Sequence, residues 1–155
     1  MKKTQQDALT ELILETFRFN GQLLSAGDAL VADLGLTSAR WQVIGAVALS
    51  PVPLPVAHIA RNMGLTRQAV QRLVNELARA GMLRFAANPH HQRAKLVLLT
   101  PRGVAAYEAA MKRQIPWAKS LAQRLSIQEI DQATATLRSL RHRLEGTSEG
   151  GHDDA

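Results

Sequence analysis

The sequence predicts a mainly helical protein with a small β-hairpin wing. It is expected to form a winged helix-turn-helix lobe, together with a helical lobe made from both termini. Three observations predict this fold. Apolar residues recur at helical spacing along most of the chain, a tight turn between two helices is centred on Gly64, and two short apolar runs after Gly81 flank a polar stretch. A helix-turn-helix followed by a two-stranded hairpin is the winged-helix arrangement, and the terminal helices are not needed to complete it.

We expect residues 1–145 to form one domain. Its terminal helices are predicted at about 4–33 and 101–144, and the winged helix-turn-helix lobe at about 37–100. Residues 146–155 are small, polar and acidic, which predicts a disordered tail.

The first predicted helix runs from about Thr4 to Val31, and Gly21 and Gly27 favour a bend or break in it. Thr37 is a good N-cap for the next helix. The proline-rich stretch at 50–55 cannot be helical throughout, because each proline disfavours helix at the residue before it. Pro55 suits the first turn of a short helix that ends near Asn62.

The turn in HIARNMGLTRQAV has the spacing that a DNA-binding helix-turn-helix needs. Ala60 is small enough to let two helices cross closely, Gly64 takes the left-handed conformation of the turn, and Val70 fills the space between the helices. A second helix begins after Thr66. The predicted core face of this corner carries Ile59, Met63, Leu65, Ala69, Val70, Leu73, Val74, Leu77 and Ala80.

The chain after Gly81 is predicted to form the hairpin and two further helices. The strands are expected at 82–86 and 94–99. Thr100 and Pro101 then cap and begin a long helix to about Arg124, with a bend expected at Pro116. A capping box at 126–129 opens the last helix, which is expected to end near Leu144.

The middle of the chain is strongly basic. The whole protein has 19 Lys and Arg against 13 Asp and Glu, a net charge of +6. Between Leu34 and Tyr107, however, Glu76 is the only acid. This asymmetry indicates a polyanionic partner, although a basic surface kept for solubility would look the same.

The exposed face of the helix after Thr66 provides the side chains that read DNA. Arginine can bond guanine O6 and N7, and glutamine or asparagine can bond adenine N6 and N7, in the major groove. The cations near the hairpin tip can reach the adjacent minor groove, although an ordinary exposed arginine there is the alternative. The predicted DNA-binding residues are Arg40, Thr66, Arg67, Gln68, Gln71, Arg72, Asn75, Arg93 and Lys95.

Three segments together resemble the MarR family of transcriptional regulators. They are LTSARW at 36–41, IARNMGLTRQAVQRLVNELARAGML at 59–83 and NPHHQRAKLVLLTPRG at 88–103, and the resemblance spans about Asp7 to Leu144. The resemblance implies a winged-helix DNA-binding lobe and a dimerisation lobe made from the N- and C-terminal helices of both chains. It also implies homodimers on pseudo-palindromic operators, usually acting as repressors that small aromatic or anionic ligands release. The wing arginine of the family maps to Arg93. The family often has an acid two residues earlier, where this chain has His91.

A candidate effector site involves Phe17, Arg18 and Trp41. Arg18 is the only Lys or Arg between Thr4 and Ala39, and it lies between two phenylalanines. A cation with apolar neighbours could bind a carboxylate ligand where the two lobes meet. An exposed or dimer-interface arginine, and a tryptophan packed in the core, are the alternative interpretations.

The composition argues against several other classes of protein. The chain has no cysteine, which excludes disulfides and thiol redox sensing. No apolar run approaches the ~20 residues needed to span a bilayer, so we expect a cytoplasmic protein without a membrane partner. The five histidines show no ligand spacing, and no nucleophile–base pair or phosphate loop is recognisable, so no metal, cofactor or enzymatic activity is expected.

The sequence therefore predicts a sequence-specific, double-stranded DNA-binding transcriptional regulator, a homodimeric repressor released by a small-molecule ligand. The alternative is a winged-helix module that binds a protein partner and has no sequence-specific affinity for DNA. The basic face of the second helix argues against that alternative.

Overall fold

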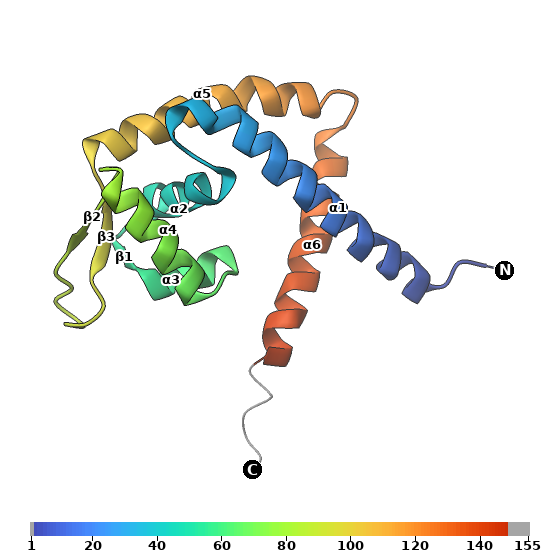
Figure 1. The fold of residues 1–155 in the computed structure, drawn as a ribbon. Coiled ribbons are helices and arrows are strands. Elements are labelled where there is room, and N and C mark those ends of the chain that lie inside the picture. Colours follow the sequence, from blue (N-terminus) through green and yellow to red (C-terminus); the bar gives the residue numbers. More distant parts are fainter. Residues whose placement is uncertain (1, 149–155) are drawn as a thin grey trace, which may run out of the picture. The chain divides into compact units, whose positions relative to one another are not determined.

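The computed structural model describes residues 2–148 and confirms the predicted fold class (Figure 1). These residues form α-helices, one short 3-10 helix and a small antiparallel sheet. The chain divides into two compact units, Met1–Ile115 and Pro116–Ala155, which are described separately. Among residues 2–148, no helix is long and apolar enough to cross a membrane.

Helix α1 (Gln5–Val31) is continuous through both glycines at which a bend was expected. Its N-terminus is closed by a capping box, in which the Thr4 backbone N–H donates to the Asp7 carboxylate at 2.9 Å. This bond lowers the pKa of Asp7. Gly27 has a packing role instead of a bending one, since a Cβ there would lie 2.3 Å from Oγ of Ser38.

Helix α2 (Ser38–Leu49) is fastened to α1 by the buried Ser38. The Ser38 backbone N–H donates to Oδ1 of Asp28 at 2.6 Å, and its hydroxyl donates to the Leu24 carbonyl at 2.7 Å. Thr37 caps α2 as predicted, accepting from the backbone N–H of Arg40. Between the two helices lies a short 3-10 helix, η1 (Ala32–Leu34).

Helices α3 (Val56–Met63) and α4 (Arg67–Arg79) form the predicted helix-turn-helix. Gly64 has φ +65°, and the next N–H donates back to the Ala60 carbonyl at 3.0 Å. Ala60 and Val70 are buried between the helices, as their spacing predicted. The prediction for Leu65 is wrong: it is 44% exposed, because it lies in the turn before α4 begins.

Strands β2 (Leu83–Ala86) and β3 (Leu96–Leu99) form the predicted hairpin. A third strand, which was not predicted, extends the sheet. Strand β1 (Leu54–Pro55) pairs with the other edge of β3, giving the antiparallel order β1-β3-β2. Pro55 therefore ends an edge strand and is the N-cap of α3, whose first residue is Val56. An edge strand tolerates proline because one of its sides needs no backbone donor.

Helix α5 (Pro101–Leu121) begins directly at the base of the wing. The Thr100 hydroxyl donates to the Gly81 carbonyl at 2.6 Å, and the Thr100 N–H donates to the Met82 carbonyl at 3.1 Å. Gly103 packs so closely that a Cβ would lie 2.0 Å from the same Met82 oxygen. The helix continues through Pro116 and ends three residues before the expected Arg124.

Arg113 of α5 holds the end of α1 within the first unit. Its Nη2 donates to Oδ2 of Asp33 at 2.8 Å, and its Nη1 bonds Oδ1 of Asp33 and also the Leu30 carbonyl, the latter at 3.0 Å. The guanidinium lowers the pKa of the Asp33 carboxyl. The largest fully buried side chains of this unit are Val31, Val43, Ile44, Ile59, Val70, Val74, Leu77 and Val97.

The second unit contains the end of α5 and helix α6 (Ile127–Ser148). The predicted capping box is present: the Ser126 N–H donates to Glu129 at 2.7 Å, and the Glu129 N–H donates to the Ser126 hydroxyl at 3.1 Å. The first of these bonds lowers the pKa of Glu129. The helix runs through Gly146 to Ser148, so it enters the segment predicted as a tail, and 149–155 lie outside the described residues.

Candidate nucleic-acid interface

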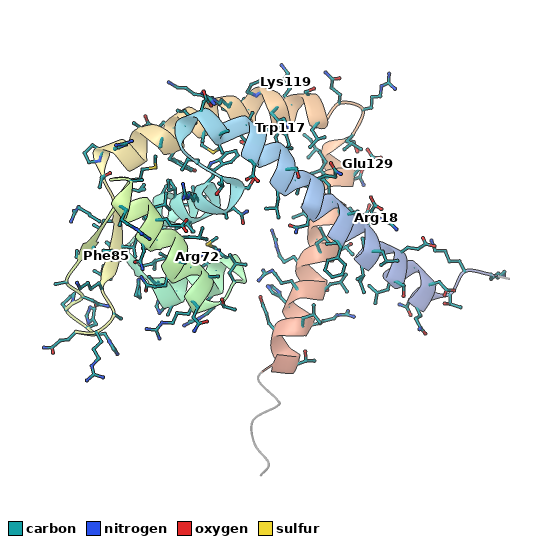
Figure 2. The ribbon with its side chains drawn as sticks, in the orientation of Figure 1. Arg18, Arg72, Phe85, Trp117, Lys119 and Glu129 are labelled. Atoms are coloured by element: carbon teal, nitrogen blue, oxygen red, sulfur yellow. The ribbon has the colours of Figure 1, made fainter. Side chains whose placement is uncertain are left out.

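The outer face of α4 is polar and exposed over its first three turns. Arg67, Gln68, Arg72 and Asn75 are exposed, and Gln71 is half-buried. Figure 2 marks Arg72 on this helix. Thr66, the N-cap, uses its hydroxyl oxygen to accept from the Ala69 N–H at 3.2 Å, which leaves its hydroxyl proton free to donate.

Two of the amide side chains on this face are paired with each other. Nε2 of Gln71 donates to Oδ1 of Asn75 at 2.9 Å. The pairing leaves the Gln71 side-chain oxygen free to accept and the Asn75 side-chain nitrogen free to donate. Those groups are the complement of the N6 donor and N7 acceptor of an adenine.

A hollow of about 190 Å³ lies between α4 and the wing. Arg67 and Gln71 line it from the α4 side, and Arg93 and Lys95 line it from the wing. The structure therefore brings together predicted residues that are up to 28 positions apart in sequence, on a single surface. The remaining lining residues are Pro55, Val56, Ala57, Phe85 and Ala94.

The tip of the wing is organised by Asn88. Its Nδ2 donates to the Ala94 carbonyl at 2.9 Å, and its Oδ1 accepts from the His90 N–H at 3.0 Å. His91, at the position where the family often has an acid, is exposed. A side-chain amide thus closes the loop that presents Arg93.

Arg40 lies away from the wing and pairs with Glu76. Its Nε and Nη2 both donate to Oε2 of Glu76, at 3.3 and 3.1 Å, and its Nη1 donates to the Gly35 carbonyl at 3.4 Å. Glu76, the only acid between Leu34 and Tyr107, is therefore paired with a cation from α2.

The three candidate effector residues lie in different surroundings within the first unit. Trp41 is half-buried and packs against the hydrophobic core. Phe17 is 71% exposed, and Arg18 is exposed and pairs with Glu15 at 3.4 Å (Figure 2). Arg18 also lines an open hollow along α1 together with the carboxylates of Glu11 and Glu15.

Phe85 was missed from the sequence as a candidate DNA contact. Alternation along a strand places it on the same side as Leu83, which is buried, so a core position would be expected. The hairpin projects beyond the helices in Figure 1, and the Phe85 side chain, labelled in Figure 2, is 37% exposed. Only the length of the hairpin relative to the helices could have revealed this.

Metal binding finds no support in the described part of the chain. Residues 2–148 contain no cluster of three or more His, Asp or Glu side chains that could hold an ion.

Comparison with known sequences points to one family. The sequence model described as the MarR family matches residues 34–94. The uncharacterised protein Rv2011c of Mycobacterium tuberculosis is 35% identical over 109 residues, which cover 70% of this chain and 75% of that protein. The transcriptional activatory protein BadR of Rhodopseudomonas palustris is 24% identical over 113 residues, covering 72% and 65% of the two chains.

Solved structures of MarR-family regulators share the fold. Sco5413 of Streptomyces coelicolor has a TM-score of 0.74 and 26% identity, covering 95% of this chain and 99% of that one. MosR of M. tuberculosis, solved in complex with DNA, has a TM-score of 0.70 and 23% identity, covering 85% and 96%. CouR of Rhodococcus jostii, bound to p-coumaroyl-CoA, has a TM-score of 0.75 and 22% identity, covering 90% and 95%.

Proposed function

This chain belongs to the MarR family of transcriptional regulators, and from that premise we propose that it is a sequence-specific DNA-binding protein that acts as a homodimeric repressor. The observation that carries the proposal is the shared surface of α4 and the wing, where Arg67, Gln71, Arg93 and Lys95 line one hollow. Amides and arginines on α4 suit base edges in the major groove, and the cations of the wing suit the adjacent minor groove.

The proposed contacts divide into three kinds. Arg67, Gln68, Gln71 and Asn75 read base edges in the major groove, Arg93 enters the minor groove with Lys95 beside it on the wing, and Thr66 and Arg72 hold the backbone. Arg40 enters this scheme indirectly: it neutralises Glu76 and holds α4, and it is not proposed to touch a base. That is a narrower role than the direct contact expected from the sequence.

Dimerisation is supported by apolar surface that each unit leaves exposed. On α1 the exposed large apolar side chains include Leu9, Ile13, Leu14 and Phe17, and α6 exposes Ile130 and Leu137 among others. Exposed apolar patches of this extent mark interaction surfaces. A symmetric dimer places two copies of α4 on the half-sites of an inverted repeat, about one DNA turn apart.

Release by a small aromatic or anionic ligand is the remaining part of the proposal. CouR, which shares the fold, is solved with p-coumaroyl-CoA bound, and BadR is named as a transcriptional activatory protein. Arg18 with Phe17 and Trp41 is the proposed effector site. The neighbouring Glu11 and Glu15 oppose an anion there, and a carboxylate ligand would have to displace Glu15 from Arg18.

The alternative function is a winged-helix module that binds a protein partner. It predicts weak, sequence-independent affinity for DNA. The hollow shared by α4 and the wing favours the DNA-binding proposal, because its charged lining residues, Arg67, Arg93 and Lys95, are all cationic and suit a phosphate backbone. We also propose a cytoplasmic, non-enzymatic protein, in keeping with binding DNA as its partner.

The decisive experiment is selection of binding sites from random duplex DNA by the purified protein. We expect an enriched inverted repeat whose half-sites are about one helical turn apart. A pool that remains random after several rounds, with weak and uniform affinity for all duplexes, would favour the protein-interaction module.

A further inference from the structure

The residues at the floor of the hollow between α4 and the wing differ in chemistry from the residues on its two walls. The Arg67 and Gln71 wall suits base edges, and the Arg93 wall suits a minor groove. The hollow itself has an apolar floor, formed by Val56, Ala57 and Phe85. None of the nine described residues that line it is acidic.

One part of a duplex has to occupy this space under the proposed function, on which the present inference rests. The major and minor grooves of B-DNA are neighbours, separated by a single sugar–phosphate strand. With α4 in one groove and the wing in the next, that strand passes between Arg67 and Arg93. The element between the two walls is therefore backbone and not a base edge.

We propose that the hollow is a seat for one sugar–phosphate unit of DNA, in which Lys95 pairs with the phosphate and Phe85 packs against the deoxyribose. Neither role follows from reading bases. Lys95 is a compact charge on a flexible stem, which suits a phosphate oxygen, whereas arginine suits the bidentate contacts on either side.

Phe85 is the reason that the hollow suits a deoxyribose with its phosphate and not only a small anion, because its ring offers an apolar surface. It is a large aromatic side chain, 37% exposed, on strand β2 opposite the fully buried Val97. It also lines a second hollow on the wing, again together with Lys95. The ring and the ammonium therefore lie along the same part of the wing, and the carbon face of a deoxyribose can cover the ring while its phosphate meets Lys95.

The first test replaces single phosphates of the selected operator by uncharged methylphosphonates. For the wild-type protein, we expect one position in each half-site, between the bases read by α4 and the minor groove entered by the wing, to weaken binding about tenfold. For Lys95→Ala, the same replacement should have no further effect. An equal penalty in both proteins would overturn the pairing of Lys95 with that phosphate.

The second test measures how affinity depends on salt. Lys95→Ala should lower the slope of log K against log salt by about 0.9 for each seat, on operator and on random duplex alike. Lys112→Ala is the matched control, because it removes the same charge from an exposed position on α5, outside the helix-turn-helix and the wing. Equal slopes for the two variants would overturn the proposal.

The third test concerns the ring. Phe85→Ala should weaken binding about fivefold at every salt concentration, with the slope unchanged, because the lost contact is apolar. Phe85→Leu should restore most of the affinity, and circular dichroism melts of both variants report whether the wing folds. If replacing a single thymine by uracil abolishes the effect of Phe85→Ala, the ring contacts a base methyl group and the sugar contact is wrong.

Failure of this inference can be told apart from failure of the proposed function. If site selection yields no inverted repeat, the sequence-specific function fails, but the salt slopes on random duplex still decide whether Lys95 holds a phosphate. If a repeat is enriched and Lys95→Ala leaves both the slope and the methylphosphonate pattern unchanged, only the sugar–phosphate seat is wrong.

Discussion

Arg40 on α2 donates both its Nε–H and an Nη2–H to one carboxylate oxygen of Glu76 on α4, at 3.3 and 3.1 Å. Both side chains are about one-third exposed. The pair joins residues that are 36 positions apart in sequence and links α2 to α4, the helix that we propose reads DNA. It also compensates the charge of Glu76, which would otherwise oppose the approach of a polyanion.

Breaking this pair should lower both stability and DNA affinity. Arg40→Ala should reduce the free energy of unfolding by about 1 kcal/mol, as expected for a partly exposed ion pair. It should also weaken DNA binding, since Glu76 then repels phosphate. Adding Glu76→Gln to Arg40→Ala should restore the DNA affinity. Urea unfolding and fluorescence anisotropy measure the two effects, and an Arg40→Ala variant with unchanged affinity would contradict the electrostatic role.

The amides and arginine at the start of α4 should set sequence specificity. Arg67→Ala or Gln71→Ala should cost about 1–3 kcal/mol per half-site and relax the preference at one or two base pairs. Repeating the site selection with each variant checks this. Gln42→Ala is the control, since it alters an exposed glutamine on α2. A uniform loss of affinity over all sequences would show that Arg67 and Gln71 contact the DNA backbone and not base edges.

Arg93 should act through the minor groove. Arg93→Ala should weaken binding most on operators with A·T-rich flanks, where the narrow groove has an enhanced negative potential. Competition between operators that differ only in their flanks measures the effect. The proposed minor-groove role is wrong if A·T-rich and G·C-rich flanks lose affinity equally.

The N-terminal half of α1 should be required for a soluble, folded dimer. Deleting Met1 to Asn20 removes exposed apolar side chains that we assign to the dimer interface, including Ile13 and Phe17. We expect the truncated protein to aggregate or fold poorly, as judged by light scattering and sedimentation. Recovery of a well-behaved monomer with full DNA affinity would refute the obligate dimer.

Arg18 should contribute to the affinity for an aromatic carboxylate. Arg18 is exposed in the free protein, so the proposal requires that the bound ligand cover it. A hydrogen-bonded pair with a carboxylate is worth roughly 1.5–3 kcal/mol when shielded from water in this way, and Arg18→Ala should then raise the Kd about tenfold. DNA binding without ligand should stay nearly intact. Titration calorimetry of salicylate-like acids decides the matter, with Arg18→Lys as a control that keeps the charge. The same Kd for the variant and the wild type removes Arg18 from the site.

Local chemistry made most of the fold predictable. The caps at Thr37, Thr66 and Ser126 and the left-handed Gly64 depend only on residues within one turn of the chain, and the structure has each of them. Strand β1 depends instead on pairing with β3, more than 40 residues away, and a two-residue strand leaves no periodic signal.

The candidate site shows the same division between local and long-range features. The exposed face of α4 follows from helical periodicity, so Arg67, Gln71 and Asn75 could be named from the sequence. The partner of Arg40 could not, because nothing in the sequence places α2 against Glu76. Gly27 was interpreted as a weak point in a helix, whereas tertiary packing against Ser38 explains the missing side chain.

The junction between the wing and α5 is tightly packed. The Thr100 hydroxyl donates to the Gly81 carbonyl and the Thr100 N–H donates to the Met82 carbonyl, both just before β2. Gly103 lies so close to the Met82 carbonyl oxygen that there is no space for a methyl group. The wing and the start of α5 are therefore directly joined at this point. A change in the direction of α5 would displace Arg93, near the distal end of the hairpin, further than the junction itself, and would shift it relative to a bound DNA groove.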